Sequence, residues 1–517
     1  MERSGGTPRA SSRRRGIITS SSKRITLPSH LKSGVLNLAT MIIEGERATA
    51  ASGETYEVRN PATGEVVDQV PSGGPEDVAR AARAAGRAQK SWGRLAPAER
   101  ARILHAAAAH MLEKVDEIAA VLTAEQGKTL LESKIEARRF GENIAWFADL
   151  ADKVHGEYVS LPDTSQYGLV LRRPIGVTGA IVPWNFPLTL AANKVAPSIA
   201  AGNAVVLKPS STTPLATLRC IEALIEGGLP EGVVNVVLGP GTGEAIVTEP
   251  LIRKVALTGS TPTGKKVAAA AAPLLKKVVL ELGGSDPCIV LDDADLDEAA
   301  KAISVGRFFN CGQACLAIKR LYVQEGVLDA LLERLVARAR KLKPGNGMAR
   351  DSRMGPMHSA TQRAEVEAQV QDALDRGARA VFGGGRPEGA EYEKGHFINP
   401  TILVDVPDDS RMVTEEVFGP ALPVMRIKDL DEGLSRANAS PFGLGSSIWT
   451  ASMAAAHRAV QELDAGYTWV NALQIAHDEL PFGGTKESGY GKEHGIEAFY
   501  QYTEQKSIVY GQLEEKT

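Results

Sequence analysis

Cysteine is scarce in this sequence, which has four cysteines among 517 residues, at positions 220, 288, 311 and 315. So few and so unevenly spaced thiols do not form a disulfide framework, which favours a reducing compartment. No group of Cys and His residues has zinc-site spacing, so we expect no metal. An excess of one charge is also missing, since 59 Lys and Arg face 62 Asp and Glu. This balance gives no reason to expect nucleic acid or a membrane as a partner.

Long hydrophobic runs are absent as well, because none reaches the roughly 20 residues that a membrane-spanning helix needs. We therefore expect a cytoplasmic protein. Residues 1–40 differ from the rest, with eight Lys and Arg against the single acid Glu2. This composition is typical of a disordered basic arm or of a transit peptide, which would direct the protein to the mitochondrial matrix. The simpler interpretation is a start codon assigned too early, since Met41 opens a well-patterned segment.

The apolar periodicity predicts an α/β protein. Residues 75–124 have helical spacing with a helix start at Pro97, whereas short apolar runs between turn signals follow Leu171. The expected strands are 176–182, 204–207, 233–238, 255–257, 278–280 and 288–291. The expected helices among and beyond them are 213–226, 264–272, 327–340 and 360–376, and residues 498–510 could form an edge strand. Buried strands that alternate with helices indicate doubly wound parallel sheets.

Three short segments carry residues suited to chemistry. Cys315 ends the run NCGQAC, and a cysteine thiolate is the strongest side-chain nucleophile at neutral pH, although a buried cysteine is more often inert. Glu281 ends an expected strand beside two glycines, where open α/β sheets bind ligands. Asn185 lies between two prolines that fix the backbone and could make its amide a rigid donor. Each segment alone also fits an ordinary turn.

Eight motifs together show that the sequence from Met41 to Tyr510 resembles the aldehyde dehydrogenase superfamily, in its succinate-semialdehyde-dehydrogenase-like branch. The motifs are PWNFP (183–187), LKP (207–209), GPGTG (239–243), LTGST (257–261), ELGG (281–284), NCGQAC (310–315), EEVFGP (415–420) and PFGG with SGYG (481–484, 488–491). The resemblance implies a homodimer or homotetramer that oxidises a small-molecule aldehyde with NAD or NADP.

The resemblance also implies a mechanism. Cys315 attacks the aldehyde to form a thiohemiacetal, whose oxyanion is held by the Asn185 amide and the Cys315 N–H. Loss of hydride to the nicotinamide leaves a thioester, which water activated by Glu281 hydrolyses. Lys194 and Glu493 match a proton relay behind that glutamate.

For the cofactor, the sequence has only a partial glycine fingerprint around Gly241. The resemblance instead implies that the pyrophosphate meets a helix start at Ser260 and Thr261, that Lys208 contacts the adenosine ribose, and that Glu416 and Phe418 contact the nicotinamide ribose. Trp184, Gly241 and Gly283 complete the expected set. At Ser211, NAD-preferring relatives often carry a glutamate. Serine leaves room for a 2′-phosphate that Lys208 could pair with, so we expect NADP to be accepted and even preferred.

Two absences bear on the substrate. Relatives that oxidise succinate semialdehyde hold its carboxylate with two arginines, and the matching positions here are Asn193 and Phe309. Bonds to a charged group contribute about 1.5–3 kcal/mol each, so their loss disfavours that substrate. Phe186, Phe309 and Phe482 suggest an apolar wall for a neutral aliphatic or aromatic aldehyde. A semialdehyde remains the alternative, with an arginine from another loop.

Other functions stay open. A CoA-acylating enzyme would usually lack the glutamate at position 281, and a thiol esterase would leave the cofactor motifs unexplained. A non-catalytic scaffold would have no need for Cys315, Glu281 and Asn185 together. Cys311 lies four residues before Cys315 and would face it on a helix, allowing a reversible disulfide, although packing is the commoner role.

The resemblance implies three structural parts. We expect a coenzyme-binding domain over 41–155 and 176–284 and a catalytic domain over 285–480. Residues 156–175 and 481–517 are expected to form a small β element that bridges to a neighbouring subunit.

Overall fold

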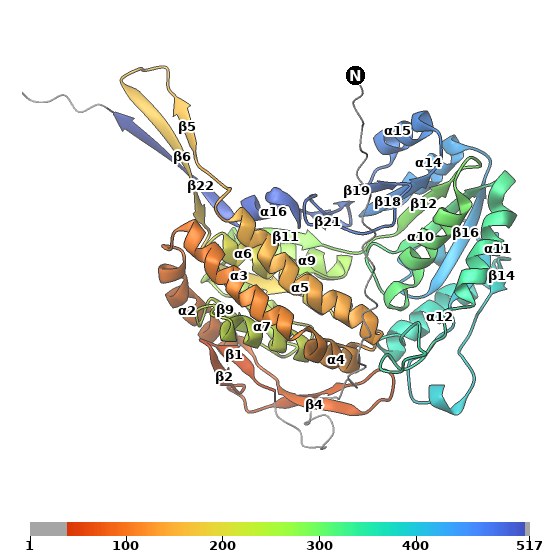
Figure 1. Ribbon diagram of the computed structural model, residues 1–517, viewed down its shortest axis with the longest axis horizontal. Helices are drawn as coiled ribbons and strands as arrows, with labels where there is room; N and C mark the ends of the chain where they lie inside the picture. Colours follow the sequence, from red (N-terminus) through yellow and green to blue (C-terminus); the bar gives the residue numbers. More distant parts are fainter. Residues whose placement is uncertain (1–38, 512–517) are drawn as a thin grey trace, which may run out of the picture.

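Two open α/β sheets form the body of the protein in the computed structural model, which describes residues 39–511 (Figure 1). The basic segment expected over residues 1–40 lies, apart from Ala39 and Thr40, outside the described residues. Within residues 39–511, no helix is both long and apolar enough to cross a bilayer.

The first sheet has eight strands, and its five central strands are parallel. In spatial order they are β2 (Glu46–Ala48), β1 (Met41–Ile43), β9 (Val234–Val236), β8 (Ala204–Lys208), β7 (Val177–Ile181), β10 (Ile252–Thr258), β11 (Lys277–Glu281) and β21 (Gly489–Tyr490). The five expected strands between 176 and 280 are confirmed. From β7 the chain moves outward to β8 and β9, then returns to β10 and moves the other way. The strand order therefore reverses between β7 and β10, where open α/β sheets bind ligands.

Alanine-rich helices pack against this sheet in one hydrophobic core. They are α2 (Pro75–Trp92), α3 (Pro97–Glu113), α4 (Val115–Gln126), α5 (Leu130–Leu150), α6 (Pro187–Ala200), α7 (Leu215–Glu226), α8 (Thr242–Thr248) and α9 (Thr261–Ala271), followed by the 3₁₀ turn η1 (Ala272–Leu274). Pro97 begins α3 as expected, since its missing N–H costs little in a first turn. Thr129 caps α5 by accepting a hydrogen bond from the Glu132 N–H.

The second sheet has seven strands, of which only the edge strand β14 is antiparallel. In spatial order they are β14 (Arg379–Phe382), β15 (Thr401–Val404), β16 (Ala421–Ile427), β13 (Ile318–Gln324), β12 (Asp286–Val290), β18 (Gly445–Trp449) and β19 (Tyr467–Val470). Its helices are α10 (Leu296–Phe308), α11 (Leu328–Ala339), α12 (Ala360–Asp375), α13 (Arg411–Thr414), α14 (Leu430–Asn438) and α15 (Met453–Glu462), with 3₁₀ turns η2 (Phe309–Gly312), η3 (Glu325–Val327) and η4 (Ala390–Tyr392). The expected helices 327–340 and 360–376 correspond to α11 and α12.

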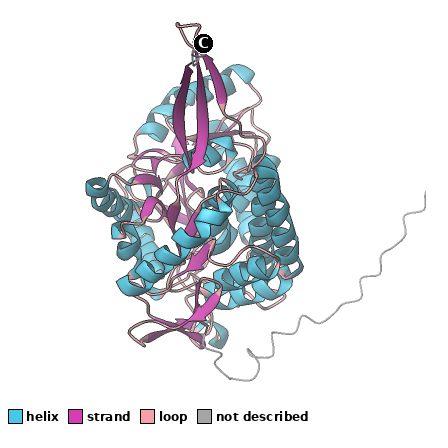
Figure 2. Cartoon of the chain, turned by 90° about the vertical axis from the view of Figure 1, so that its left-hand side faces the viewer, coloured by secondary structure: helices cyan, strands magenta, loops and turns pink. Residues whose placement is uncertain are grey.

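Three antiparallel strands project from the body as an arm, seen at the top of Figure 2. They are β5 (Glu157–Ser160), β6 (Gln166–Pro174) and β22 (Thr503–Gly511), with β6 in the middle. Two small ribbons complete the described fold, β3 (Thr55–Arg59) with β4 (Val66–Pro71) and β17 (Phe442–Gly443) with β20 (Thr485–Lys486).

The C-terminal segment differs from the expectation in two ways. The single edge strand predicted over 498–510 is wrong in its first part, because helix α16 (Gly495–Gln501) precedes β22. Ala498, Phe499 and Tyr502 are buried against the first core, and this spacing is that of a helix face. Residues 481–511 also do not form one element, since β20 pairs with β17, β21 extends the first sheet and only β22 joins the arm.

Candidate active site

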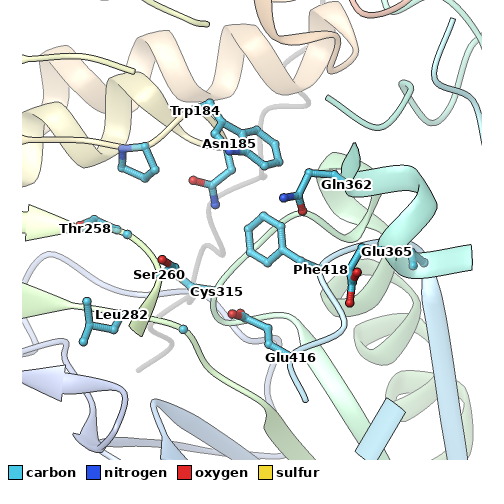
Figure 3. Close-up of a pocket in the computed structure, with 14 residues that line it drawn as sticks. Trp184, Asn185, Thr258, Ser260, Leu282, Cys315, Gln362, Glu365, Glu416 and Phe418 are labelled. Atoms are coloured by element: carbon cyan, nitrogen blue, oxygen red, sulfur yellow. The ribbon is translucent and has the colours of Figure 1, made fainter. Parts of the chain in front are cut away.

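A cavity of about 280 Å³ opens between the carboxyl ends of β7, β10 and β11 and the segments that precede β13 and β16 (Figure 3). Seven residues expected at the site line it, namely Trp184, Asn185, Ser260, Gly283, Cys315, Glu416 and Phe418. Sequence reasoning missed Gln362, Glu365 and Val366 of α12, which line it too. They belong to an ordinary amphipathic helix and have no local signal of function. The cavity lies at the predicted edge of the first sheet.

The nucleophile turn, which we define as residues 309–315, connects α10 to β13. Asn310 and Cys311 adopt left-handed backbone conformations, with φ of 52° and 56°, and Gly312 follows with φ of 71°. Non-glycine residues in this region are strained, so the turn depends on its surroundings to hold it. The Asn310 N–H donates to Glu132 at 2.7 Å, and the Arg307 guanidinium donates to the Gly312 carbonyl at 3.0 Å.

The two cysteines of this turn have different surroundings. Cys315 is half-buried and packs beside Leu444, Trp469 and Phe482. Cys311 is fully buried in a core of the second sheet, with its sulfur 3.8 Å from that of Met357. Left-handed residues interrupt the helix at this turn, so Cys311 and Cys315 do not face each other as they would on a continuous helix. The geometry favours a packing role for Cys311.

Burial raises the pKa of the Cys315 thiol to about 12. The Lys319 ammonium lowers this pKa, whereas the carboxylates of Glu281, Glu416 and Asp286 raise it. The thiol is therefore protonated in this state of the protein, and a nearby positive charge is needed to favour the thiolate.

Asn185 places an amide donor next to the nucleophile turn. Its Nδ2 donates to the Gln313 carbonyl at 3.1 Å, and Figure 3 shows the side chain pointing into the cavity. Its backbone carbonyl accepts from Lys128 Nζ at 2.7 Å and from Asn310 Nδ2 at 2.9 Å. Asn185 is only 4% exposed. The donor is thus held in position before any substrate arrives, as oxyanion stabilisation requires.

A buried ion pair that sequence reasoning missed supports this loop. Lys128 Nζ lies 2.5 Å from Glu136 of α5, and both side chains are almost fully buried. Glu136 also accepts from the Leu188 N–H at 2.8 Å, at the start of α6. The pair therefore connects α5 with the Asn185 loop, which lies 57 residues from Lys128 in the chain.

Glu281 is the last residue of β11 and is buried behind the cavity. Burial raises the pKa of its carboxyl well above the usual value, and Glu493 raises it further, against the opposite effects of Lys194 and Lys492. Its Oε1 has no hydrogen-bond partner among the described residues. A Cβ at Gly483 would lie 2.5 Å from this oxygen, so glycine at 483 leaves the carboxyl its space. Burial and the neighbouring Glu493 therefore favour the protonated form of Glu281, which becomes a base when it loses its proton.

Lys194 and Glu493, for which the resemblance implies a proton relay, form a buried ion pair, and both act on the pKa of Glu281. The Lys194 ammonium also donates to Thr258 Oγ1 at 2.6 Å. Asn193, expected in the substrate pocket, instead donates from Nδ2 to Glu493 Oε2 at 3.0 Å and lies 3.1 Å from His494 Nε2.

A further acid lies behind His494. The His494 Nδ1 is 2.8 Å from Asp478, which also accepts from Arg139 of α5 at 2.9 Å and from Asn143 at 3.1 Å. His494 and Asp478 have no sequence signal of a site, since their partners are remote in the chain. We call Lys194, Glu493, Asn193, His494 and Asp478 the relay network.

The cofactor side of the cavity has features that suit an anion and a ribose. Ser260 caps α9, whose first turn contains no acid, and the free N–H groups and dipole of such a helix start favour phosphate. Thr261 is buried and donates to the Glu487 carbonyl at 3.0 Å. Glu416 accepts from the Gly284 N–H at 3.2 Å, and a Cβ at Gly283 would lie 2.5 Å from its Oε2. Glycine at 283 is therefore needed for this close approach.

Two aromatic residues border the same side. Trp184 contacts the edge of Phe418, with ring centres 5.7 Å apart, and stacks on His358 at 4.5 Å. Burial lowers the pKa of His358 to about 4, so this ring is neutral at physiological pH.

Besides Thr261, three expected cofactor residues lie outside the cavity lining, namely Lys208, Ser211 and Gly241. Lys208 ends β8, and burial lowers its pKa to about 8. Its Nζ donates to the Pro209 carbonyl at 3.2 Å, and no carboxylate among the described residues pairs with it. Ser211 follows three residues later, and Gly241 precedes α8, whose Gly243 approaches the Lys208 side chain.

The expected apolar wall divides into two aromatic groups. Phe186 and Phe309 stack with parallel rings 6.1 Å apart, and the Lys128 ammonium lies 4.1 Å from the Phe186 ring centre. Phe482 packs with Tyr467 and Trp469 in the cluster that contacts Cys315. Tyr467 and Trp469 were missed because they belong to β19, an edge strand whose aromatic residues have no local signal of function. No group of three or more His, Cys, Asp or Glu residues between 39 and 511 is arranged to hold a metal ion.

Comparisons with known proteins agree with this geometry. Residues 48–508 match the aldehyde dehydrogenase family. Betaine aldehyde dehydrogenase of Sinorhizobium fredii is 41% identical, with 92% of this chain and 97% of that protein covered. The 3-sulfolactaldehyde dehydrogenase of Pseudomonas putida is 40% identical, covering 93% and 99%, and the glutarate-semialdehyde dehydrogenase of Pseudomonas putida is 39% identical, covering 91% and 98%.

Solved structures show the same architecture. An E. coli NADP-dependent enzyme superposes with a TM-score of 0.90 at 38% identity, over 92% of this chain and 100% of that one. A Staphylococcus aureus betaine aldehyde dehydrogenase solved with NAD⁺ has a TM-score of 0.88 at 34% identity, over 93% and 97%. The expected fold is confirmed, and with it the family resemblance. The chain belongs to the aldehyde dehydrogenase family and is an aldehyde dehydrogenase, an oxidoreductase.

Proposed function

We propose that this enzyme oxidises a neutral aldehyde to its carboxylic acid with NAD or NADP, through a thioester on Cys315 that Glu281 helps to hydrolyse. The observation that carries the proposal is the meeting of three groups at one sheet edge. Cys315 and Asn185 line one cavity, the Asn185 amide reaches the nucleophile turn, and the Glu281 carboxyl acts on the Cys315 thiol from behind.

The residues around the cavity fit a dinucleotide. The start of α9 offers Ser260 and free N–H groups to a pyrophosphate, and the Glu416 carboxylate can accept hydrogen bonds from ribose hydroxyls. Lys208, without a carboxylate partner, can contact the adenosine ribose. When bound, the nicotinamide accepts the hydride that the aldehyde carbon loses.

Cys315 and Asn185 carry out the first step. The thiolate adds to the aldehyde carbon, and the carbonyl oxygen becomes an oxyanion that accepts from the Asn185 amide and the Cys315 N–H. Such donors contribute about 3–4 kcal/mol each to the transition state. The Asn185 amide nitrogen has two hydrogens, so one can bind the oxyanion while the other stays on the Gln313 carbonyl, and the backbone of Asn185 is anchored by Lys128.

Glu281 and the relay network carry out the second step. Once deprotonated, Glu281 removes a proton from the water that attacks the thioester carbon, and the Cys315 thiolate leaves. Lys194 and Glu493 lie beside Glu281 and are placed to receive and pass on its proton.

Cofactor preference and substrate class follow from particular residues. Ser211 adds no negative charge near Lys208, so we propose that NADP is accepted. The Lys128 ammonium, which contacts the Phe186 ring, is already paired with Glu136. It is therefore not free to bind a carboxylate substrate, which favours a neutral aldehyde. An ω-carboxylic semialdehyde is the second candidate, because a glutarate-semialdehyde dehydrogenase is among the relatives.

We also propose a homodimer or homotetramer that assembles through the three-stranded arm. Tyr158, Tyr167 and Tyr510 stack along it and are 41–68% exposed. Exposed aromatic residues on a projecting sheet are typical of an interface. The four free cysteines support a reducing compartment such as the cytoplasm.

The test is cofactor reduction across aliphatic, aromatic and ω-carboxylic aldehydes, each with NAD and NADP, on wild type and Cys315→Ala. We expect turnover that is highest with neutral aldehydes, proceeds with NADP and disappears in the variant. A preference for semialdehydes would overturn the substrate class alone. Folded protein that reduces neither cofactor with any aldehyde would overturn the function, and ester hydrolysis without cofactor would indicate a thiol esterase.

A further inference from the structure

We propose that Lys319 is a positioning residue of this enzyme, whose buried ammonium connects the nucleophile turn to Glu416 and favours the Cys315 thiolate. This inference rests on the proposed function, in which Cys315 is the nucleophile and Glu416 a cofactor ligand. Lys319 lies in β13, four residues after Cys315, and its side chain is fully buried.

The contacts of Lys319 join the two sides of the cavity. Its Nζ donates to the backbone carbonyls of Ala314, at 2.8 Å, and of Cys315. The same nitrogen lies 3.0 Å from Glu416 Oε1 and 5.9 Å from the Phe418 ring centre. One ammonium thus contacts the backbone of the nucleophile and the carboxylate proposed to bind the nicotinamide ribose.

The charges around the thiol give this lysine a second role. Four ionisable side chains act on Cys315, and three of them are acids, Glu281, Glu416 and Asp286. Lys319 is the only cation of the four. Without it, a thiolate at 315 would form among carboxylates in a poorly hydrated site, which disfavours the charged form.

Burying the Lys319 ammonium costs free energy, so stability alone does not explain its position. A buried lysine loses its hydration, and two carbonyls with one carboxylate return only part of that free energy. Lys276 is a matched case elsewhere in the fold, since it is also buried and donates to two carbonyls, those of Ile246 and Glu249. Lys276 has no contact with the cavity lining and serves as the control.

The experiment measures alkylation of Cys315 by iodoacetamide in the intact enzyme, followed by mass spectrometry at several pH values between 7 and 9. In this range the alkylation rate is proportional to the thiolate fraction. A ratio of rates between two variants that is the same at every pH therefore reports a difference in the pKa of their Cys315 thiols. We expect Lys319→Met to be alkylated roughly three- to tenfold more slowly. Loss of the cation raises the pKa of the Cys315 thiol and lowers the thiolate fraction about tenfold, and the greater nucleophilicity of the more basic thiolate offsets part of this loss. Lys319→Arg should recover most of the rate, and Lys276→Met should match wild type.

Glu416→Gln provides a test of opposite sign that remains available if Lys319→Met does not fold. Removing this carboxylate should increase the alkylation rate by a few-fold, because one of the groups that disfavour the thiolate is gone. Folded Lys319→Met with the wild-type rate at every pH, or Glu416→Gln without an increase, would overturn the proposal. Alkylation needs neither aldehyde nor turnover. If the proposed function is wrong, the wild-type enzyme will instead reduce neither cofactor with any aldehyde.

Discussion

The cavity around Cys315 and the relay network behind Glu281 lie side by side but are built differently. In the cavity, the functional side chains bind mainly backbone atoms, as Asn185 does with Gln313 and Lys319 with Ala314, and the thiol remains partly accessible. In the relay network, side chains bind one another and are almost fully buried.

The two regions also differ in how their charged side chains are paired. Lys194 pairs with Glu493, whereas Glu281 has no ion-pair partner among the described residues, and burial together with the Glu493 charge raises its pKa. At the cavity, the Lys319 ammonium instead pairs with Glu416, which is partly exposed on the cavity wall. Changes in the cavity should therefore alter chemistry with little loss of stability, whereas changes in the relay network should alter both.

The largest effect is expected at the nucleophile. Cys315→Ala should lower turnover by about 10⁴-fold or more without a change in melting temperature, because it removes the reacting atom from a partly open site. Cys311→Ala, four residues earlier, should keep turnover within about twofold and lose roughly 1–2 kcal/mol of stability, as a buried packing residue does. Steady-state rates and thermal unfolding of both variants test the contrast. Comparable losses of turnover would assign Cys311 a chemical role.

Glu281→Gln should slow thioester hydrolysis by about 10²–10⁴-fold while cofactor reduction in the first turnover continues. Because the pKa of Glu281 is raised, wild-type turnover should increase with pH as the base form appears, and the variant should lose this dependence. Rapid-mixing measurements and the mass of acylated Cys315 follow the two steps. A variant with no accumulated acyl-enzyme would place the base elsewhere.

The same ionisation affects stability. The folded protein holds the Glu281 proton above the usual carboxyl pKa of about 4.3, so unfolding free energy falls as pH rises above that value. Glu281→Gln should remove this part of the pH dependence in denaturant titrations.

Lys194→Met should break the relay network itself. It leaves Glu493 without its cation in a buried site, so we expect a loss of about 3–5 kcal/mol of stability as well as reduced turnover. The double variant Lys194→Met with Glu493→Gln should recover part of the stability but not the activity, since the unpaired charge is gone while the relay is not restored. Denaturant unfolding of the three proteins measures the coupling, and a single variant as stable as wild type would contradict the pairing.

The smallest expected effect is on cofactor choice. Ser211→Glu should raise the KM for NADP by roughly tenfold and leave that for NAD within about twofold, because a carboxylate repels the 2′-phosphate. Ser211→Gln has similar bulk without the charge and separates repulsion from crowding. Equal effects of both variants on both cofactors would show that position 211 does not face the 2′ position.

The amino-acid sequence alone predicted the fold class, and it identified Cys315, Asn185 and Glu281 as candidate reacting groups. Strands such as β7 and β8 are short apolar runs that stay recognisable because burial on both faces requires apolar residues throughout. These candidate reacting groups lie within contiguous motifs. Their residue types therefore indicate a chemical role even when their partners in the fold are unknown. The tail shows the limit, since weak alternation concealed helix α16.

Which charged side chains are buried, and what they bind, became visible only in the folded protein. Lys128, Lys319 and Asp478 have no local signal, because their partners lie in distant segments, as Lys194 and Glu493 do across 299 residues. Burying a charged side chain without a partner costs much free energy, so a charged residue met in the sequence predicts a surface position. Folding brings the compensating group to it, and burial together with the neighbouring charges shifts the pKa values of Glu281 and the Cys315 thiol.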